Sequence, residues 1–523
     1  MQVGFLACIL LLLCLHSEGF LALAQLPVVF LFATKNSLVS LLLGPGHGYE
    51  KLNYVHRWSG RGLFLAALIH GSLWIRNHIQ YSLPILGPQK ETSGVAAFAL
   101  LCIIVLSSLK PVRIYLRQIF FYVQYVHPCS CILRRADDRG ISSVMTYVSF
   151  FVTICYHTIY ARPWIYPALA FYALDLLLRL FRYRIKDATL TCVKGMTIVC
   201  TCASLQGFRS LTGSQINIDG CDGGWEAGQH IQLRVFFEGR VFESHPLTIA
   251  NAPSSTSCLA NRSIVLGARM TGDWTRALNQ YVSAEQQRIS RENSEKEEAV
   301  PVPLQVMIDG PYGGCSLDLG EYESVLLVAG GAGVTFTLGL LDDLVGRIVR
   351  HQRVRGERTR RVEFAWAIRS FGKRIPHPRL LLLLDTMSRP TISLGCIDWI
   401  APMLVDIANA AAGSSLDLHI SIFVTCLCDP EAVPSIPNSI TTIVRPDVHR
   451  LLANLLSPPP ADDDVEGESG GSAQRAIGMG GVGVCASGPD SLTRESANAV
   501  ARLAPTYAKR VGGIALHTEV FSL

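Results

Sequence analysis

The chain has 523 residues, of which 49% are hydrophobic and 17% are charged, and its formal net charge is +5. This composition and a mean hydropathy of +0.31 argue against an ordinary soluble protein. No block of basic residues interleaved with aromatic residues points to a nucleic-acid partner. The sixteen cysteines show no repeated metal-ligand spacing, so free and mostly buried thiols are expected.

The apolar runs lie before residue 182 and predict a multi-pass α-helical membrane domain. The first run is short and lacks a basic leader, which favours a shortened membrane helix over a signal peptide. Lysine and arginine clusters flank the runs and place the remainder of the chain in the cytosol by the positive-inside rule. The expected spans are 3–15, 20–43, 54–79, 94–109, an interrupted segment 114–160, and 164–181.

Two histidines, His56 and His70, lie fourteen residues apart inside the apolar segment 54–79. On an α-helix this spacing corresponds to a rise of about 21 Å and returns to within about 40° of the starting direction. One helix face would carry an imidazole toward each edge of a bilayer core that is roughly 30 Å thick. A single such histidine more often hydrogen-bonds a neighbour, but the pair favours axial ligation of two stacked haems.

After residue 186 the sequence changes to short β-rich segments broken by Gly, Pro and Asn, which predicts a small antiparallel barrel. The segment 270–275 should open a helix whose backbone N–H groups face an anion. The charged run 285–298 is expected to be a solvated loop. A strand around 306–313 then closes the barrel.

From residue 325 the pattern becomes α/β. An apolar strand runs into the turn Gly330-Gly331-Ala332-Gly333, and a helix follows, an arrangement that lets a backbone approach a pyrophosphate. Further strands at 361–368, 418–426 and 483–486 predict a parallel sheet with a nucleotide across its carboxyl edge. Arg369 could hold a 2′-phosphate and so favour NADPH, or it could be an ordinary surface charge.

In their order along the chain, these features resemble the fungal ferric/cupric reductase transmembrane component family, which is related to the NADPH oxidases. The shared features are the histidine-bearing helices, His-Pro-x-Thr, Gly-Pro-Tyr-Gly, the glycine-rich turn and a terminal Gly-Pro. The resemblance extends from about residue 20 to the last residue. It implies a haem-binding helical bundle followed by a ferredoxin-reductase-like module, with a β-barrel FAD domain and an α/β NADPH domain.

Residue roles also follow from the resemblance. Thr248 would lie near the isoalloxazine and His245 toward the pyrophosphate, while Phe521 would cover the flavin ring; Thr248 and Phe521 are the catalytic candidates. The other residues implied in cofactor binding are Pro246, Leu247, Gly272, Trp274, Gly310, Pro311, Gly330, Gly331, Gly333, Val334, Thr335, Trp366, Arg369, Arg445, Gly488 and Pro489.

The sequence departs from the family pattern at two places. Many relatives carry Cys-Gly-Pro beside the nicotinamide, and here the triplet begins with Ser487. The partner histidines, expected about thirteen residues apart on a second helix, are here His127 and His157, thirty apart. We interpret residues 128–144 as an insertion of seventeen residues, such as a translated intron. His157 would then pair with His70, and His127 with His56, as the metal ligands.

The implied domains are 1–185 for haem binding, 186–318 for FAD and 319–523 for NADPH. The implied function is transmembrane reduction of ferric or cupric chelates by electrons from cytosolic NADPH, through FAD and two b-type haems. A plasma-membrane location in the lipid bilayer and coupling to an iron permease and oxidase system are further implications. Two alternatives stay open: an oxidase that reduces O₂ to superoxide, and a haem-deficient membrane protein with a vestigial flavin domain.

Overall fold

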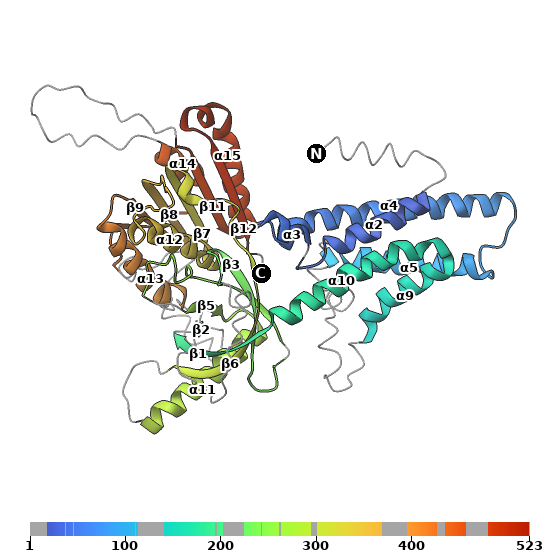
Figure 1. Ribbon diagram of the computed structural model, residues 1–523, viewed down its shortest axis with the longest axis horizontal. Helices are drawn as coiled ribbons and strands as arrows, with labels where there is room; N and C mark the ends of the chain where they lie inside the picture. Colours follow the sequence, from blue (N-terminus) through green and yellow to red (C-terminus); the bar gives the residue numbers. More distant parts are fainter. Residues whose placement is uncertain are drawn as a thin grey trace, which may run out of the picture. The chain divides into compact units, whose positions relative to one another are not determined.

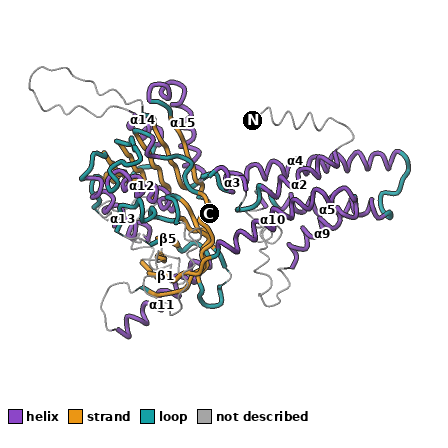
Figure 2. The backbone as a smooth tube through the Cα atoms, viewed as in Figure 1, coloured by secondary structure: helices purple, strands orange, loops and turns teal. Residues whose placement is uncertain are grey.

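The computed structural model divides into two compact units, Met1–Phe181 and Arg182–Leu523, which we describe separately (Figure 1). The first is helical, and the second combines two β-sheets with helices (Figure 2). The structure describes residues 18–36, 38–44, 46–109, 111–112, 141–193, 196–201, 224–241, 243–260, 263–293, 301–368, 395–425, 435–456 and 480–521.

The helical unit is built around a small apolar core in which α2, α4, α5 and α9 meet the start of α10. Its described elements are α2 (Glu18–Leu31), α3 (Leu38–Leu43), α4 (Tyr49–Gln80), α5 (Gln89–Ser107), α9 (Ile141–His157), a 3-10 turn (Ile159–Ala161) and α10 (Arg162–Arg182). By length and composition, two helical stretches among these residues could cross a membrane, Gln89–Ser107 and Ile159–Arg182.

The predicted span 20–43 is wrong as a single helix, because the chain breaks between α2 and α3. At the break, Asn36 is buried, and both its backbone N–H (2.8 Å) and its side-chain amide (3.1 Å) donate to Asp175 Oδ1 on α10. Arg179 pairs with the other oxygen of Asp175. These buried hydrogen bonds and the ion pair therefore stabilise the chain where the helix is interrupted.

The predicted membrane span 54–79 lies in one continuous helix, α4, which carries both His56 and His70, but α4 is not among the described helices that could cross a membrane by length and composition. The second histidine-bearing segment is only partly described. Helix α9 begins at Ile141, so the last four residues of the proposed insertion continue directly into the helix that ends at His157. The rest of that insertion, His127 and the expected span 3–15 lie outside the described residues.

The first sheet is antiparallel, with strand order β4-β3-β6-β1-β2-β5, as the barrel prediction requires. A bridge between Ile249 and Leu266 and a 2.9 Å hydrogen bond from Ala250 N to Val265 O join its two edges, so the sheet closes on itself. The elements are β1 (Arg184–Val193), β2 (Met196–Thr201), β3 (Gln229–Val235), β4 (His245–Thr248), β5 (Ile264–Arg269), α11 (Asp273–Asn293) and β6 (Val302–Gly313).

The charged run after residue 285 is not a loop at its start, because α11 continues to Asn293. Arg288 pairs with Glu285 and, at 3.0 Å, with Glu292 on the exposed side of this helix. Ion pairs between residues three and four positions apart stabilise a helix. From its composition alone, this segment was predicted to be a solvated loop.

The second sheet is parallel throughout, with order β10-β9-β8-β7-β11-β12. Helices α12 and α13 cover one face and α14 and α15 the other (Figure 1). The elements are a 3-10 turn (Leu319–Glu321), β7 (Ser324–Gly330), a 3-10 turn (Gly331–Gly333), α12 (Val334–Val349), β8 (Arg361–Ile368), α13 (Gly395–Ala412), β9 (Asp417–Val424), β10 (Ser439–Thr442), α14 (Val448–Leu456), β11 (Val482–Gly488), α15 (Asp490–Val511) and β12 (Ile514–Val520).

Candidate cofactor sites

The glycine-rich turn after β7 lies against the end of β11. A Cβ on Gly333 would lie 2.4 Å from Ser487 O, and one on Gly330 would lie 2.8 Å from the Pro489 ring. Gly488 adopts φ +151°, and a Cβ there would meet the Gly330 backbone at 3.0 Å. Glycine is therefore required on both sides of this contact, which brings the two predicted nucleotide segments together.

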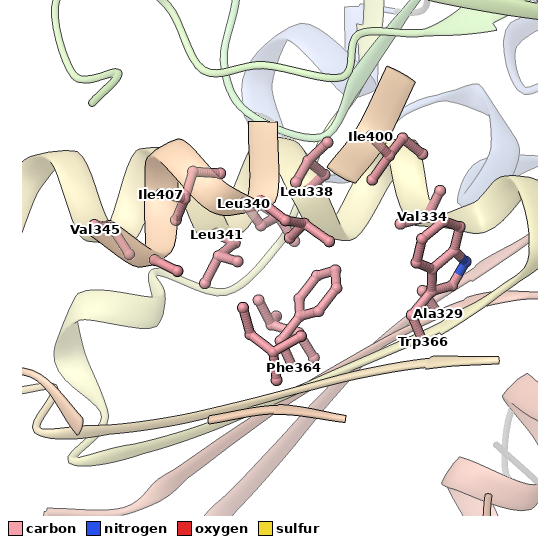
Figure 3. Packing of buried hydrophobic residues seen from close by; sticks show 14 of the residues in the cluster. Ala329, Val334, Leu338, Leu340, Leu341, Val345, Phe364, Trp366, Ile400 and Ile407 are labelled. Atoms are coloured by element: carbon pink, nitrogen blue, oxygen red, sulfur yellow. The ribbon is translucent and has the colours of Figure 1, made fainter. Parts of the chain in front are cut away.

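Three other residues that were predicted to bind the nucleotide contact this turn from the buried side. Trp366 is fully buried, and its indole N–H donates to Gly331 O at 3.1 Å. Figure 3 shows Trp366 beside Val334 and Ala329. Val334 is buried in the same core, and the Thr335 hydroxyl donates to Ala332 O at 3.1 Å. These side chains hold the turn in place and leave its backbone as the surface for a ligand.

The C-terminal aromatic residue lies at the same edge of the sheet. The Phe521 N–H donates to Gly488 O at 2.8 Å, and the half-buried ring packs against the core under α12. The neighbouring Ser487 is fully buried, and its hydroxyl has no hydrogen-bond partner within the described parts of the chain. An unpaired buried hydroxyl beside a glycine cradle fits a polar ligand group at this position.

Of the two arginines predicted to bind the nucleotide, only Arg445 lies within the described residues. Arg445 is exposed between β10 and α14, where its guanidinium is open to solvent. Arg369 follows β8 directly and lies outside the described residues. The sequence prediction that Arg369 meets a 2′-phosphate stays a prediction.

The two predicted flavin segments meet in the barrel. The His245 ring on β4 stacks on Trp274 at the start of α11, with ring centres 4.1 Å apart and planes inclined by 25°. Burial lowers the pKa of His245, and the nearby Glu243 carboxylate partly opposes this effect, so the imidazole is neutral at neutral pH. Trp274 is buried, and its indole N–H finds no acceptor among the residues that the structure describes.

The expected anion site at the start of α11 is partly occupied by the protein itself. The backbone N–H groups of Thr271 and Gly272 both donate to Thr275 Oγ1 at 3.0 Å. That hydroxyl in turn donates to Gly272 O at 2.9 Å. The Thr275 side chain therefore satisfies donors that the sequence pattern had left for an anion.

Thr248 and the Gly310-Pro311 segment are brought to the same region of the barrel. Thr248 pairs with His230 between β4 and β3, and His230 pairs with Tyr312 between β3 and β6. Gly310 adopts φ +133°, which favours glycine. Pro246 and Leu247 lie opposite the adjacent β3 residues in the same ladder.

Asp342, which was not predicted from the sequence as a site residue, joins the flavin segment to the nucleotide helix. This fully buried carboxylate on α12 accepts hydrogen bonds from Ala252 N (2.8 Å), Ser257 Oγ (2.7 Å) and Cys258 N (2.9 Å). The loop that supplies these donors follows β4. The feature of the sequence that could have identified Asp342 is a carboxylic acid on the apolar face of a predicted helix.

In the helical unit, His70 on α4 faces His157 at the end of α9. Their ring centres are 6.2 Å apart, and the ring planes are inclined by 73°. His157 Nδ1 lies 2.9 Å from Lys90 O, and His56 Nδ1 lies 2.8 Å from Val29 O. Because a carbonyl can only accept, each of these Nδ1 atoms carries the proton, which leaves Nε2 free as a ligand.

Small residues make room around the His70–His157 pair. A Cβ on Gly94 would lie 2.6 Å from His157 Nδ1, and one on Gly19 would lie 3.3 Å from the His70 ring. Helices α5 and α2 can therefore approach these imidazoles closely only because they carry glycine there.

The barrel and the parallel sheet define a flavin-reductase module, which follows a histidine-bearing helical unit in the chain. Matches to two protein families are consistent with this division. Residues 18–133 match the family described as ferric reductase like transmembrane component. Residues 221–316 match the FAD-binding domain family. The predicted resemblance to the fungal ferric/cupric reductase transmembrane components is thereby confirmed.

Two curated relatives show the extent of this similarity. The ferric/cupric reductase transmembrane component 2 of Schizosaccharomyces pombe is 26% identical over 359 residues, covering 62% of this chain and 57% of the relative. The ferric reductase transmembrane component 1 of the same organism is 25% identical over 378 residues, covering 67% and 59%. The chain thus spans somewhat more than half the length of these relatives.

Among solved structures, a ferredoxin NADP+ reductase from Neisseria gonorrhoeae with bound FAD and NADP aligns with 64% of this chain and 98% of its own. The identity is 10% and the TM-score 0.31, too low to establish a common fold. The fold assignment therefore stands on the strand order and pairing of the two sheets.

Proposed function

We propose that this protein is a membrane-bound reductase of ferric or cupric chelates that takes electrons from NADPH through FAD and two b-type haems. The observation that carries the proposal is the convergence of the glycine-rich turn, Ser487-Gly488 and Phe521 at one edge of the parallel sheet. It supports a nucleotide site of the kind expected for a reductase that also has an FAD-binding domain.

For NADPH, the residues of the turn supply the cradle. Gly330 and Gly333 let the turn pack on the end of β11, and Gly331, with nothing within 4 Å of its Cβ position, leaves the backbone open to a pyrophosphate. The first turn of α12 presents N–H groups and a positive helix end. The buried Ser487 hydroxyl is available to a polar group of the nicotinamide. Arg369 and the exposed Arg445 are the proposed ligands of the 2′-phosphate.

For FAD, the stacked pair His245 and Trp274 marks the proposed site. The neutral imidazole can donate a hydrogen bond to the pyrophosphate, and the unpaired indole N–H of Trp274 fits a further acceptor. Thr248, which pairs with His230 of β3, is the proposed contact to the isoalloxazine. Phe521 would exclude water by covering the ring.

For haem, His70 and His157 fit one iron. Their ring centres lie 6.2 Å apart, and the two imidazoles would hold the iron through their ring nitrogens. His157 and His56 each keep Nε2 free by donating Nδ1–H to a backbone carbonyl, which is the usual arrangement of a ligating histidine. His127 remains the proposed partner of His56.

When bound, FAD converts hydride transfer from NADPH into single-electron steps, and the haem irons relay single electrons across the lipid. The residues named above bind and orient these groups. We further propose a plasma-membrane location, with the reductase module in the cytosol and the chelate outside, and coupling to an iron permease and oxidase system.

The test uses sealed right-side-out vesicles that contain the full chain, with NADPH trapped inside and an impermeant ferric chelate outside. We expect NADPH-dependent chelate reduction together with a reducible b-type Soret band. A version that lacks residues 128–144 tests whether that segment interrupts haem binding. Superoxide release that persists with excess chelate would contradict the proposal in favour of an oxidase. Absence of the Soret band from both versions would contradict it in favour of a haem-deficient protein.

A further inference from the structure

Two cysteines that the proposed function does not use lie in contact inside the reductase unit. Cys315 Sγ is 3.5 Å from Cys485 Sγ, although the residues are 170 positions apart in the sequence. Cys315 follows β6, the last strand of the barrel, and Cys485 lies on β11, in the parallel sheet. This contact therefore joins the segment that leaves the barrel to a strand of the second sheet.

The two thiols differ in exposure. Cys485 is fully buried, and its strand neighbours are Leu327 on β7 and His517 on β12. Cys315 is half-buried, and the next residue, Ser316, is exposed. A small molecule from solvent can thus reach Cys315 before Cys485.

The segment that carries Cys315 is held in place by the buried His517. The Ser316 N–H (3.2 Å) and hydroxyl (2.8 Å) both donate to His517 Nδ1, and the opposite ring nitrogen lies 3.2 Å from Glu519 Oε1. The imidazole also stacks on Phe336 of α12, with ring centres 5.5 Å apart. The segment that carries Cys315 is therefore held by neighbours on two elements, β12 and α12.

We propose that Cys315 and Cys485 form a reversible dithiol–disulfide site that responds to hydroperoxides. The Cys315 thiolate attacks one oxygen of the hydroperoxide; the O–O bond breaks, and the leaving oxygen takes a proton to become water or an alcohol. The Cys485 sulfur then attacks the sulfur of the resulting sulfenic acid; the S–O bond breaks, and the leaving oxygen takes the Cys485 thiol proton and departs as water. Two thiols lose two electrons in total, and the hydroperoxide gains them.

The local chemistry supports Cys315 as the group that reacts first. The hydrogen bond from Cys485 lowers the pKa of Cys315 to about 7, although burial acts in the opposite direction. Burial and the neighbouring Asp342 carboxylate instead raise the pKa of Cys258, another half-buried cysteine of this unit. A thiolate is the reactive form, so Cys315 should react at neutral pH while Cys258 stays a thiol.

The test treats the detergent-solubilised full chain with hydrogen peroxide at pH 7 and alkylates the remaining thiols, and peptides are then mapped by mass spectrometry. We expect one cross-linked peptide pair, Cys315 with Cys485, that dithiothreitol separates, with Cys258 recovered in alkylated form. The Cys485→Ala variant should instead accumulate a Cys315 sulfenic acid that dimedone traps.

Two further variants complete the experiment. Cys315→Ser should abolish the cross-link, and because this position is half-buried the fold should be kept. Cys192→Ser, which replaces a half-buried cysteine that contacts Asn279, should leave the cross-link unchanged. Failure of wild-type protein to form the pair, or oxidation of Cys315 beyond sulfenic acid at the same rate in wild type and Cys485→Ala, would overturn the proposal. Neither the cross-linked peptide pair nor the dimedone adduct requires reductase activity. The proposed disulfide can therefore be disproved independently of the proposed function.

Discussion

The backbone N–H of Phe521 donates to the carbonyl of Gly488 at 2.8 Å, which fixes the C-terminal aromatic residue beside the end of β11. Gly488 in turn packs on Gly330 of the glycine-rich turn. Three segments that are distant in sequence therefore meet at one point. A ring placed there can cover a flavin, and a main-chain bond holds it whatever side chain the residue carries.

Replacement of Phe521 by alanine should slow flavin reduction by NADPH with little effect on stability. An aromatic stacking contact is worth about 1 kcal/mol, which corresponds to a rate effect of about fivefold. Stopped-flow absorbance of the flavin measures this rate. Phe521→Tyr keeps the ring and should retain the wild-type rate. Equal rates for the alanine variant and the wild type would show that the ring does not cover the flavin.

Gly333→Ala should weaken NADPH binding and destabilise the second sheet. The new Cβ would lie 2.4 Å from Ser487 O, so β11 and the turn must separate. Overpacking of this kind costs about 1–3 kcal/mol. The KM for NADPH and the midpoint of urea unfolding measure the two effects. Gly413→Ala is the matched control, because nothing lies within 4 Å of its Cβ position; equal effects of both substitutions would exclude the close approach.

Local patterns were sufficient to predict the reductase module. Alternation in short segments indicated the barrel, and the apolar strand before Gly330 indicated the parallel sheet, because both patterns follow from which faces are buried. The order of motifs then gave the candidate sites. The helix carrying His56 and His70 was predictable because apolar residues predominate between Arg61 and Arg76.

Features that depend on distant partners were not predictable. The break at Asn36 depends on Asp175, 139 residues away, and the role of Asp342 depends on a loop about 85 to 90 residues before it. Trp366 was expected to meet the nucleotide, whereas the structure places it under the turn as a core residue. The hydrophobic periodicity of one segment does not indicate which other segment packs against it.

Substitution of His70 or His157 should remove one of the two haems. If both bind one iron, His70→Ala should lower the b-type Soret absorbance by about half, and His157→Ala should do the same. The double variant should lose no more than either single variant, because the second substitution acts on a site already lost. His78→Ala, eight residues further along the same helix α4, is the control and should keep full absorbance. Additive losses would show that the two histidines serve different haems.

Asp342→Ala should destabilise the reductase unit strongly. It leaves the N–H groups of Ala252 and Cys258 and the Ser257 hydroxyl without their buried acceptor, at a cost of about 2–5 kcal/mol. Urea unfolding followed by flavin fluorescence measures the change. The control is Asp273→Ala, whose side chain is 90% exposed and pairs with Arg276 at 3.3 Å; its effect should stay below about 1 kcal/mol. A similar small effect of Asp342→Ala would contradict the proposed anchor.

The half-buried His245 should make the stability of the reductase unit fall in mild acid. Its pKa is lowered in the folded state, chiefly by burial, whereas in the unfolded chain it returns to about 6.5. As the pH falls below the unfolded value, the unfolded state binds a proton that the folded state does not, so folding loses free energy until the folded pKa is reached. Thermal unfolding of the full chain at pH 7.5 and at pH 5.5, about one unit on either side of that value, measures the difference. His245→Gln, which cannot titrate, should reduce the loss, while the exposed His351→Gln should leave it unchanged. An identical pH response of His245→Gln and wild type would show that this imidazole is not the group responsible.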